Sequence, residues 1–500
     1  MKIQIGIAMI AGASVVYGAS DVAKAAERRD AATVRALIAK KADVNEKSAD
    51  GSSALLWAAH WNDVEAARAL IKAGADVKAA NRLGASPLSE AAALGSAPLV
   101  QLLLDAGADA KSVSTTDGET VLMTAARAGN VDAVKLLLDR GADVNAKETY
   151  KGQTALMWAA AERHTDVVKL LLTRGADWRA KSNEHETKMP KLSAASSVTP
   201  MARGGLTAIS FTAREGDLET AKVMLDAGVD INIVDGEHTS PLVIALMNKQ
   251  YTFAKFLLDR GADPNVADTF GRGGLFAAID MRNEDYSALP RRAQTDPMPS
   301  IEIVQALIAK KANLNQPLVQ KLPGRSGMDT GDGTMGEGST PLMRAARAGD
   351  ADVMRLLLKA GADATLKTKE GNTALLFAAG VGYRDKNTSG TEAGALEAVK
   401  VAMAAGQPLD QTNTRGETAL HGAASRGADS IAQFLIDQKV DLNARTKLNQ
   451  TALDVAMGKG SFGLPVPHDS TVALLKKAGA KEGQDLPPLP GVRRAVEAKQ

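Results

Sequence analysis

The chain has 500 residues, of which 45% are hydrophobic, 3% aromatic and 24% charged, and its formal net charge is only +2. This near balance gives no reason to expect nucleic acid or an acidic membrane surface as a partner. The absence of cysteine excludes disulfides, thiolate metal sites, thiol nucleophiles and haem attachment through thioethers.

The first 20 residues have the pattern of a secretory signal peptide. A short basic start, Met1-Lys2, precedes an uncharged and mostly apolar run over 3–17, and residues 18–20 are small enough for cleavage. The run is short for a membrane span, and an uncleaved anchor or a cytoplasmic first helix is the alternative. We expect a periplasmic or secreted protein that is not inserted in a membrane after residues 1–20 are removed.

A Gly-Ala-Asp motif that follows a leucine-rich run organises the rest of the chain. The leucines form the apolar stripe of an amphipathic helix, and the glycine ends that helix in a left-handed conformation. Clear copies begin at Gly74, Gly107, Gly141, Gly175, Gly261 and Gly361, and weaker ones at Lys41, Gly228, Lys311, Gly406, Lys439 and Gly479. A period of about 33 residues indicates about twelve stacked repeats, and therefore a solenoid.

Each repeat has the same predicted order of elements. An Asp/Gly turn and a capping Ser or Thr come first, then a short alanine-rich helix, a second turn and the leucine-rich helix. Pro87, Pro241 and Pro341 follow their caps directly, where a missing N–H costs little. The first repeat, with helices over 21–30 and 32–40, lacks the leading turn and has the polar surface of a capping repeat.

The segment from Thr120 to Gly129, together with 134–145, resembles an ankyrin repeat nearly position by position. Thr340 to Met343 and Thr418 to His421 resemble the Thr-Pro-Leu-His helix start of that family. The resemblance implies an all-α ankyrin-repeat solenoid of helix-turn-helix repeats with finger turns, over residues 21–480. His421 alone keeps the family histidine, so we expect looser turn-to-helix hydrogen bonding in the other repeats.

The period is interrupted in five places. Residues 182–203 and 316–337 lengthen finger turns, whereas 284–300, 384–393 and 459–469 separate the two helices of a repeat. Stacking would place the two finger insertions about 30 Å apart on one edge. They mark either the binding side or surface growth that loops tolerate.

The C-terminal tail, residues 481–500, contains the run Leu486-Pro487-Pro488-Leu489-Pro490, which favours extended polyproline. The tail is either a peptide ligand or a fraying end, and we expect the latter.

Several short motifs resemble parts of catalytic or metal-binding sites, but the further residues that such sites need are missing. Asp329-Thr330-Gly331 has no second copy, which an aspartic protease requires, and 329–337 lacks the alternating ligands of an EF-hand. Glu184-His185-Glu186 favours a solvated loop over a metal site. No phosphate-binding glycine loop or nucleophile elbow is present. We expect no enzyme activity, no cofactor and no metal.

One position of the alanine-rich helices, two residues after the first leucine, should face the concave groove. It reads Trp57, Glu90, Thr124, Trp158, Phe211, Ile244, Ala277, Arg344, Phe377, Gly422 and Val455. Large apolar residues there, and arginines three residues later, suit a protein or peptide partner. The predicted groove contains Trp57, His60, Trp61, Glu90, Arg127, Trp158, Phe211, Arg214, Ile244, Arg344, Arg347 and Phe377. Internal packing of these side chains is the alternative.

We therefore expect a monomeric protein-interaction scaffold whose partner the sequence does not identify. Three alternatives stay open: a protector or chaperone of a periplasmic enzyme, a secreted effector, and an enzyme that depends on a metal or on the insertions.

Overall fold

The computed structural model describes residues 21–113, 117–186, 202–283, 295–322, 335–383, 390–459 and 466–486. The predicted signal peptide, the Asp329-Thr330-Gly331 string and the polyproline run after Leu486 lie outside the described residues. The same holds for part of each of the five insertions, including the first residues of 284–300 and 384–393.

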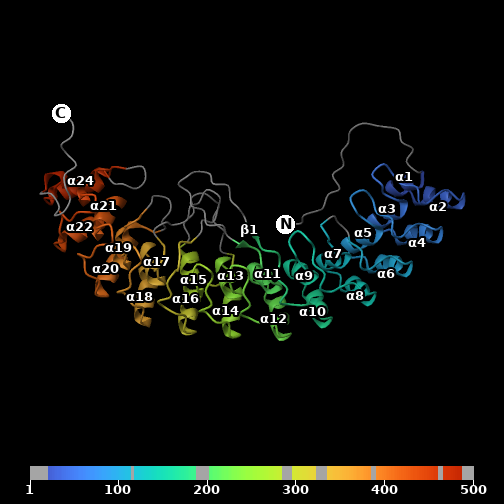
Figure 1. The fold of residues 1–500 in the computed structure, drawn as a ribbon, viewed down its shortest axis with the longest axis horizontal. Helices are drawn as coiled ribbons and strands as arrows, with labels where there is room; N and C mark the ends of the chain where they lie inside the picture. Colours follow the sequence, from blue (N-terminus) through green and yellow to red (C-terminus); the bar gives the residue numbers. More distant parts are fainter. Residues whose placement is uncertain are drawn as a thin grey trace, which may run out of the picture. The chain divides into compact units, whose positions relative to one another are not determined.

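The described residues form 24 α-helices, which follow one another as consecutive pairs (Figure 1). We call the first helix of each pair inner and the second outer. The inner helices are α1 Asp21–Glu27, α3 Ala54–His60, α5 Pro87–Ala93, α7 Val121–Ala128, α9 Ala155–Ala161, α11 Ala208–Glu215, α13 Pro241–Met247, α15 Gly274–Arg282, α17 Pro341–Arg347, α19 Ala374–Ala379, α21 Ala419–Arg426 and α23 Ala452–Ala456. The outer helices are α2 Ala31–Ala39, α4 Val64–Lys72, α6 Ala97–Asp105, α8 Val131–Asp139, α10 Thr165–Thr173, α12 Leu218–Asp226, α14 Tyr251–Asp259, α16 Ser300–Ala309, α18 Ala351–Ala360, α20 Glu392–Ala404, α22 Asp429–Asp437 and α24 Asp469–Lys477.

The helices belong to two compact units, which are described separately. The first contains residues 1–183 and 222–227, and the second contains 184–221 and 228–500. Within each unit, inner helices pack on the inner helices of neighbouring repeats, and outer helices on outer ones, which gives two layers. The predicted all-α solenoid is confirmed. A two-residue ribbon, β1 His185–Glu186 with β2 Ala202–Arg203, is the one sheet in the described part of the chain.

Both layers contribute buried alanines and leucines to the core, and alanine is especially frequent on the inner helices. Ala59 and Ala126 on inner helices are fully buried, and so are Leu103 and Leu137 on outer helices. Small alanines let the inner helices approach closely, while the leucines fill the wider space between inner and outer layers. The buried faces of neighbouring repeats therefore merge into one continuous core within each unit.

An asparagine after the outer helix links successive repeats. Asn145 Oδ1 accepts the Asp177 N–H at 2.7 Å, and its Nδ2 donates to the Gly175 carbonyl at 3.2 Å. Asn45 and Asn265 make the equivalent pair of bonds. Since the amide satisfies a donor and an acceptor of the next repeat at once, it fixes the spacing of the two repeats.

The finger turns are joined by backbone hydrogen bonds from one repeat to the next. The Thr149 N–H donates to the Asp117 carbonyl at 2.6 Å, and the Thr414 N–H to the Glu370 carbonyl at 2.8 Å. At Gly118, φ is 79° and an added Cβ would lie 3.3 Å from the Thr149 side chain. A glycine is needed there both for the left-handed backbone and for the close approach of the next finger.

The finger insertion 316–337 is closed at its root by the backbone. The Leu318 N–H donates to the Ser339 carbonyl and the Gly338 N–H to the Leu318 carbonyl, both at 2.8 Å. Leu318 and Met335, which lie on either side of the segment 323–334 that the structure does not describe, are buried. The two ends of this insertion therefore lie together on the solenoid.

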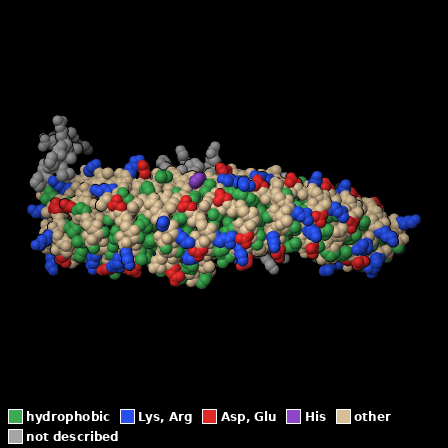
Figure 2. Space-filling view, turned by 90° about the horizontal axis from the view of Figure 1, so that it is seen from below, with side chains coloured by type: hydrophobic (Ala, Val, Ile, Leu, Met, Phe, Trp, Pro, Cys, Tyr) green, Lys and Arg blue, Asp and Glu red, His purple; other side chains and the backbone are tan. Residues whose placement is uncertain are grey.

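Outer helices carry ion pairs between repeats. Arg174 Nη1 lies 2.8 Å from Asp139 Oδ1, and Arg140 pairs with Asp105 in the same way one repeat earlier. Figure 2 shows cationic and anionic side chains interspersed over the face in view. These half-exposed pairs contribute little stability each but prevent large areas of one charge.

The hydrogen bond lost with the family histidine is restored by other residues in some repeats. His421 Nδ1 accepts the Thr418 N–H at 3.2 Å, and its Nε2–H donates to the Gln450 carbonyl at 3.1 Å. Ser89 and Ser210 accept the equivalent cap N–H through their hydroxyls. The expected loosening therefore does not extend to every repeat, because serine offers the same acceptor.

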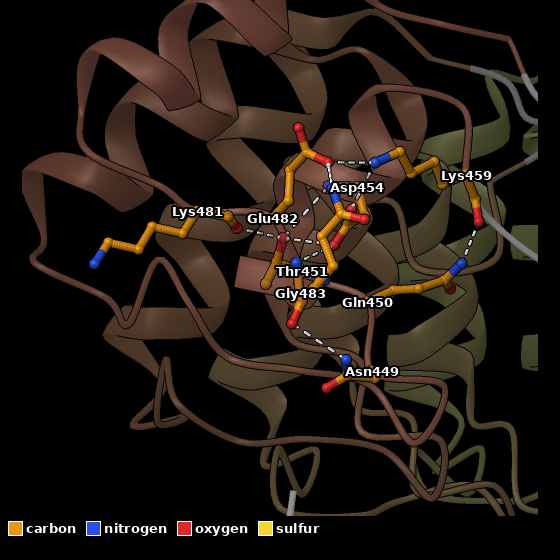
Figure 3. Close-up of polar contacts among 9 residues, drawn as sticks. Asn449, Gln450, Thr451, Asp454, Lys459, Lys481, Glu482 and Gly483 are labelled. Atoms are coloured by element: carbon orange, nitrogen blue, oxygen red, sulfur yellow. Dashed lines mark hydrogen bonds and ion pairs between the residues drawn. The ribbon is translucent and has the colours of Figure 1, made fainter. Parts of the chain in front are cut away.

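The start of the predicted tail, residues 481–486, packs on the last repeat (Figure 3). Asp454 Oδ2 accepts the Thr451 N–H at 3.0 Å and the Gly483 N–H at 2.7 Å. Burial raises the pKa of the Asp454 carboxyl, but these hydrogen bonds and Lys459 outweigh it, so the pKa lies below its ordinary value. Asp454 thus caps its own helix and holds the terminal segment against α23.

Candidate protein-binding surface

The inner helix α3 of the first unit carries an aromatic cluster, which we define as Trp57, His60 and Trp61. The two indoles are stacked with centroids 6.4 Å apart, and the imidazole lies edge-on to each. All three side chains are half-buried. The 57 and 61 positions lie one helical turn apart, so both indoles occupy the same side of α3.

Neighbouring repeats hold this cluster in place. His60 Nδ1 lies 3.0 Å from Glu90 Oε2 on α5, and the Trp61 indole N–H donates to the Glu27 carbonyl at 3.1 Å. The Arg29 guanidinium lies 5.1 Å from the Trp61 ring centroid. Arg29 is not among the predicted groove residues, because it follows α1 in the turn of the truncated first repeat and has no place in the helix register.

A second tryptophan surface lies on α7 and α9. The Arg127 guanidinium stacks 4.7 Å from the Trp158 ring centroid and lies 3.6 Å from Glu119 Oε1. A cavity of about 210 Å³ adjoins the indole. It is lined by Arg127, Lys151, Gln153, Met157, Trp158, Ala161 and Glu162.

Both tryptophans of the predicted register have an unsatisfied indole. The Nε1 atoms of Trp57 and Trp158 are buried and have no hydrogen-bond partner among the described residues. A buried donor without a partner costs stability, which makes these two positions exceptions that packing alone does not explain.

In the second unit, most of the predicted groove residues are buried. Phe377 is 1% exposed, Phe211 4% and Ile244 9%. Arg214 is exposed; it pairs with Glu215 at 3.0 Å and stacks 5.2 Å from the Phe211 centroid. At the three apolar positions the structure shows internal packing, the alternative that the sequence left open, so they offer a partner almost no surface.

Two further predicted residues, Arg344 and Arg347 of α17, are held by neighbouring repeats. Arg344 Nε donates to Asp280 Oδ1 at 2.7 Å and Nη2 to the Asn283 carbonyl at 2.8 Å. Arg347 Nη2 donates to the Gly382 carbonyl at 2.9 Å and is itself buried. Asn283 and Gly382 lie just before the insertions 284–300 and 384–393. The two arginines of α17 therefore hold the chain directly ahead of each insertion.

The structure brings the predicted residues together in the first unit as two surfaces, around Trp57 and around Trp158. Of the residues that line the second surface, Arg127 and Trp158 were predicted, whereas Lys151, Gln153, Met157, Ala161 and Glu162 were not. Lys151 lies in a finger turn rather than on the helix register. Lys151 lies three residues before the Thr154 cap, and a finger turn leads directly into the inner helix. This short distance in sequence could have indicated that Lys151 lies near Trp158. Binding itself stays a prediction for all twelve residues.

In the described residues, His, Asp and Glu side chains form no group of three that could hold a metal ion. None of the described helices combines the length and the apolar character that crossing a membrane requires.

Comparison with known proteins points to one family. Models of ankyrin repeats in several copies match residues 22–113, 88–182 and 187–268, and also 331–378 and 393–456. A similar curated protein is the human transient receptor potential cation channel subfamily A member 1, 25% identical over 239 residues. That alignment spans 47% of this chain but only 18% of the channel. A similar solved structure is the human ASB11 ankyrin repeat domain, with 24% identity, a TM-score of 0.41, and coverage of 49% of this chain and 99% of that one.

Proposed function

We propose that this chain, which belongs to the ankyrin-repeat family, is a scaffold and binds a protein partner through its inner helices. Ankyrin repeats are in general protein–protein interaction modules. The proposal places the binding surface on the first unit, over α3 and α9, and assigns no catalytic role to the chain.

One observation carries this proposal: half-buried tryptophans lie on the inner helices of a chain in which only 3% of residues are aromatic. Trp57, Trp61 and Trp158 account for three of the four tryptophans. Aromatic side chains dominate binding energy when a partner covers them. In a solenoid core made of alanine and leucine, a large half-buried ring contributes more to an interface than to packing.

A pull-down with single tryptophan variants tests the proposal. The full chain is immobilised and incubated with an extract of the native cell envelope, and the captured protein is identified and then purified. Trp57→Ala and Trp158→Ala should each weaken binding of the purified partner by about tenfold or more, as expected for hot-spot residues. Trp178→Ala is the matched control, because this tryptophan lies in the turn after α10 and stacks with its neighbour Arg179. Equal binding by all three variants and the wild type would reject the surface.

We also propose that the protein acts outside the cytoplasm, on the pattern of residues 1–20 alone. Amino-terminal sequencing of the mature native protein should find a start near residue 21. A mature chain that begins at Met1 in the cytoplasmic fraction would contradict export.

A further inference from the structure

We propose that the cavity beside Trp158 binds an acidic side chain of an extended segment of the partner. This inference rests on the proposed scaffold function and adds the chemistry of what the scaffold recognises. It concerns only α7, α9 and the finger turn before α9, all within the first unit.

The cavity combines an apolar floor with two cations. Trp158, Met157 and Ala161 line it from one helix, and Arg127 and Lys151 contribute the positive charges. Glu162 is the one carboxylate in the lining. The lining residues therefore carry one more cation than anions, and outside the lining Glu119 lies at ion-pair distance from Arg127.

The two cations keep donors for a ligand. Arg127 is oriented by its stack on Trp158, while Glu119 lies 3.6 Å away, beyond an ordinary hydrogen bond. Within the part of the chain that the structure describes, the Lys151 ammonium has no carboxylate at ion-pair distance. A carboxylate between these two groups would gain charge-assisted hydrogen bonds that the free protein does not make.

Other charged residues of the predicted groove already use their hydrogen-bonding groups within the protein. Arg344 is paired with Asp280, and Arg347 donates to main-chain carbonyls of the next repeat. At the α3 aromatic cluster, His60 already faces the carboxylate of Glu90. Among the twelve predicted residues, Arg127 is thus the cation that combines a cavity, a stacked indole and spare donors.

The size and position of the cavity favour a peptide side chain as the ligand. About 210 Å³ is below the range of about 300–1,000 Å³ that is typical of small-molecule sites. Lys151 follows Tyr150, which is 64% exposed in the finger turn. A segment crossing from this turn to α9 would cover Tyr150 and place one acidic side chain at Arg127 and Lys151. Glu162 would disfavour a second acid at the far rim.

Peptide selection on the full-length protein tests this inference. The probe is a phage-displayed library of random dodecapeptides, selected in parallel on the wild type, Lys151→Gln, Arg127→Gln and Lys135→Gln. Lys135 is the matched control, because it is an exposed lysine on the outer helix α8. Wild-type and Lys135→Gln selections should enrich peptides with one Asp or Glu next to an apolar residue, and the other two selections should lose that acidic position.

The best wild-type peptide is then synthesised with a fluorophore and measured by fluorescence polarisation. Lys151→Gln should weaken binding by about fivefold and Arg127→Gln by about tenfold, and Lys135→Gln should stay within about twofold. Replacing the acidic residue of the peptide by its amide should have the effect of the Arg127 variant. Added salt should weaken binding of the wild type.

Three results would overturn the inference: no enriched peptide, enrichment without an acidic position, or equal binding by all variants. If Arg127→Gln melts at a lower temperature than the wild type, Lys151→Gln decides, since that residue is exposed. If the tryptophan variants abolish the pull-down while both charge variants leave it unchanged, the scaffold function stands and the acidic ligand is wrong.

Discussion

Arg344 and Asp280 form an ion pair of 2.7 Å that joins α17 to α15, and each side chain is only about an eighth exposed. The two residues are 64 positions apart in the chain. The pair lies beside Asn283, which directly precedes the insertion 284–300, so Arg344, one of the residues predicted for the groove, also joins two repeats of the solenoid.

Replacing Arg344 should therefore cost folding stability. In Arg344→Ala, Asp280 loses its cation and the Asn283 carbonyl loses a donor, for a cost of about 2–4 kcal/mol in the free energy of unfolding. Urea unfolding followed by circular dichroism measures the change. Arg355→Ala is the control, because the ion pairs of Arg355 with Asp352 and Glu397 are exposed and the change should affect stability little. Similar midpoints for the two variants would contradict the structural role.

The asparagine link between repeats predicts a position-dependent effect. Asn145→Ala removes two hydrogen bonds to the next repeat and should cost about 1–3 kcal/mol of unfolding free energy. Lys111 occupies the same place one repeat earlier, so Lys111→Ala should be close to neutral. Thermal unfolding of the two variants compares them directly. A larger shift for Lys111→Ala would show that the amide link does not matter.

His421 predicts a loss of stability in mild acid. Burial lowers the pKa of His421 below its ordinary value of 6.5 and outweighs the bond to the Gln450 carbonyl, which alone would raise it. The Nδ1 atom also accepts the Thr418 N–H, which requires that this nitrogen is unprotonated. Because the unfolded chain then binds the proton more readily than the folded one, the stabilisation is complete above about pH 6.5. It is lost as the pH falls from there through the folded pKa.

Unfolding midpoints between pH 8 and pH 5 check this. Relative to the wild type, His421→Gln should lose less stability across that interval, although it is less stable at pH 8. His238→Gln is the control, since that histidine is exposed in its finger turn. Parallel pH profiles for the wild type and His421→Gln would contradict the assignment.

The contact of Gly483 with the last repeat predicts that the terminal segment stabilises the solenoid end. In Gly483→Ala the added Cβ would meet the Asn449 carbonyl oxygen and Asp454 Oδ2, so residues 481–486 should detach. The loss of this segment should cost about 1–3 kcal/mol locally and increase hydrogen exchange over 449–459. At Gly336 an added Cβ meets nothing within 4 Å, and Gly336→Ala is the control. Unchanged exchange in Gly483→Ala would contradict a capping role.

Local rules were enough to predict the repeat. Thr120 and Ser53 cap inner helices as their positions indicated, and Gly141 ends its outer helix with φ of 87°. These features depend on residues within a few positions of one another, and the period then repeats them. Stacking follows, because a single helix pair cannot bury its own apolar face.

The candidate site was less predictable, because exposure depends on neighbours that are distant in sequence. Trp158 and Phe377 hold the same register position, yet one is half-buried and the other 1% exposed. The register gives the direction of a side chain from its own helix but not what the next repeat places over it. Arg344 shows the same limit, since Asp280 lies across an insertion.

The two ends of the finger insertion 316–337 are held together by backbone hydrogen bonds at its base. The repeats around the insertion should therefore not depend on its length. Leu318 is bonded to Gly338 and Ser339 in the manner of a hairpin base. We therefore expect that the residues between can be shortened, replaced or tagged while the repeats on either side keep their register. This insertion is therefore a suitable site for grafting a foreign loop or attaching a fluorescent label.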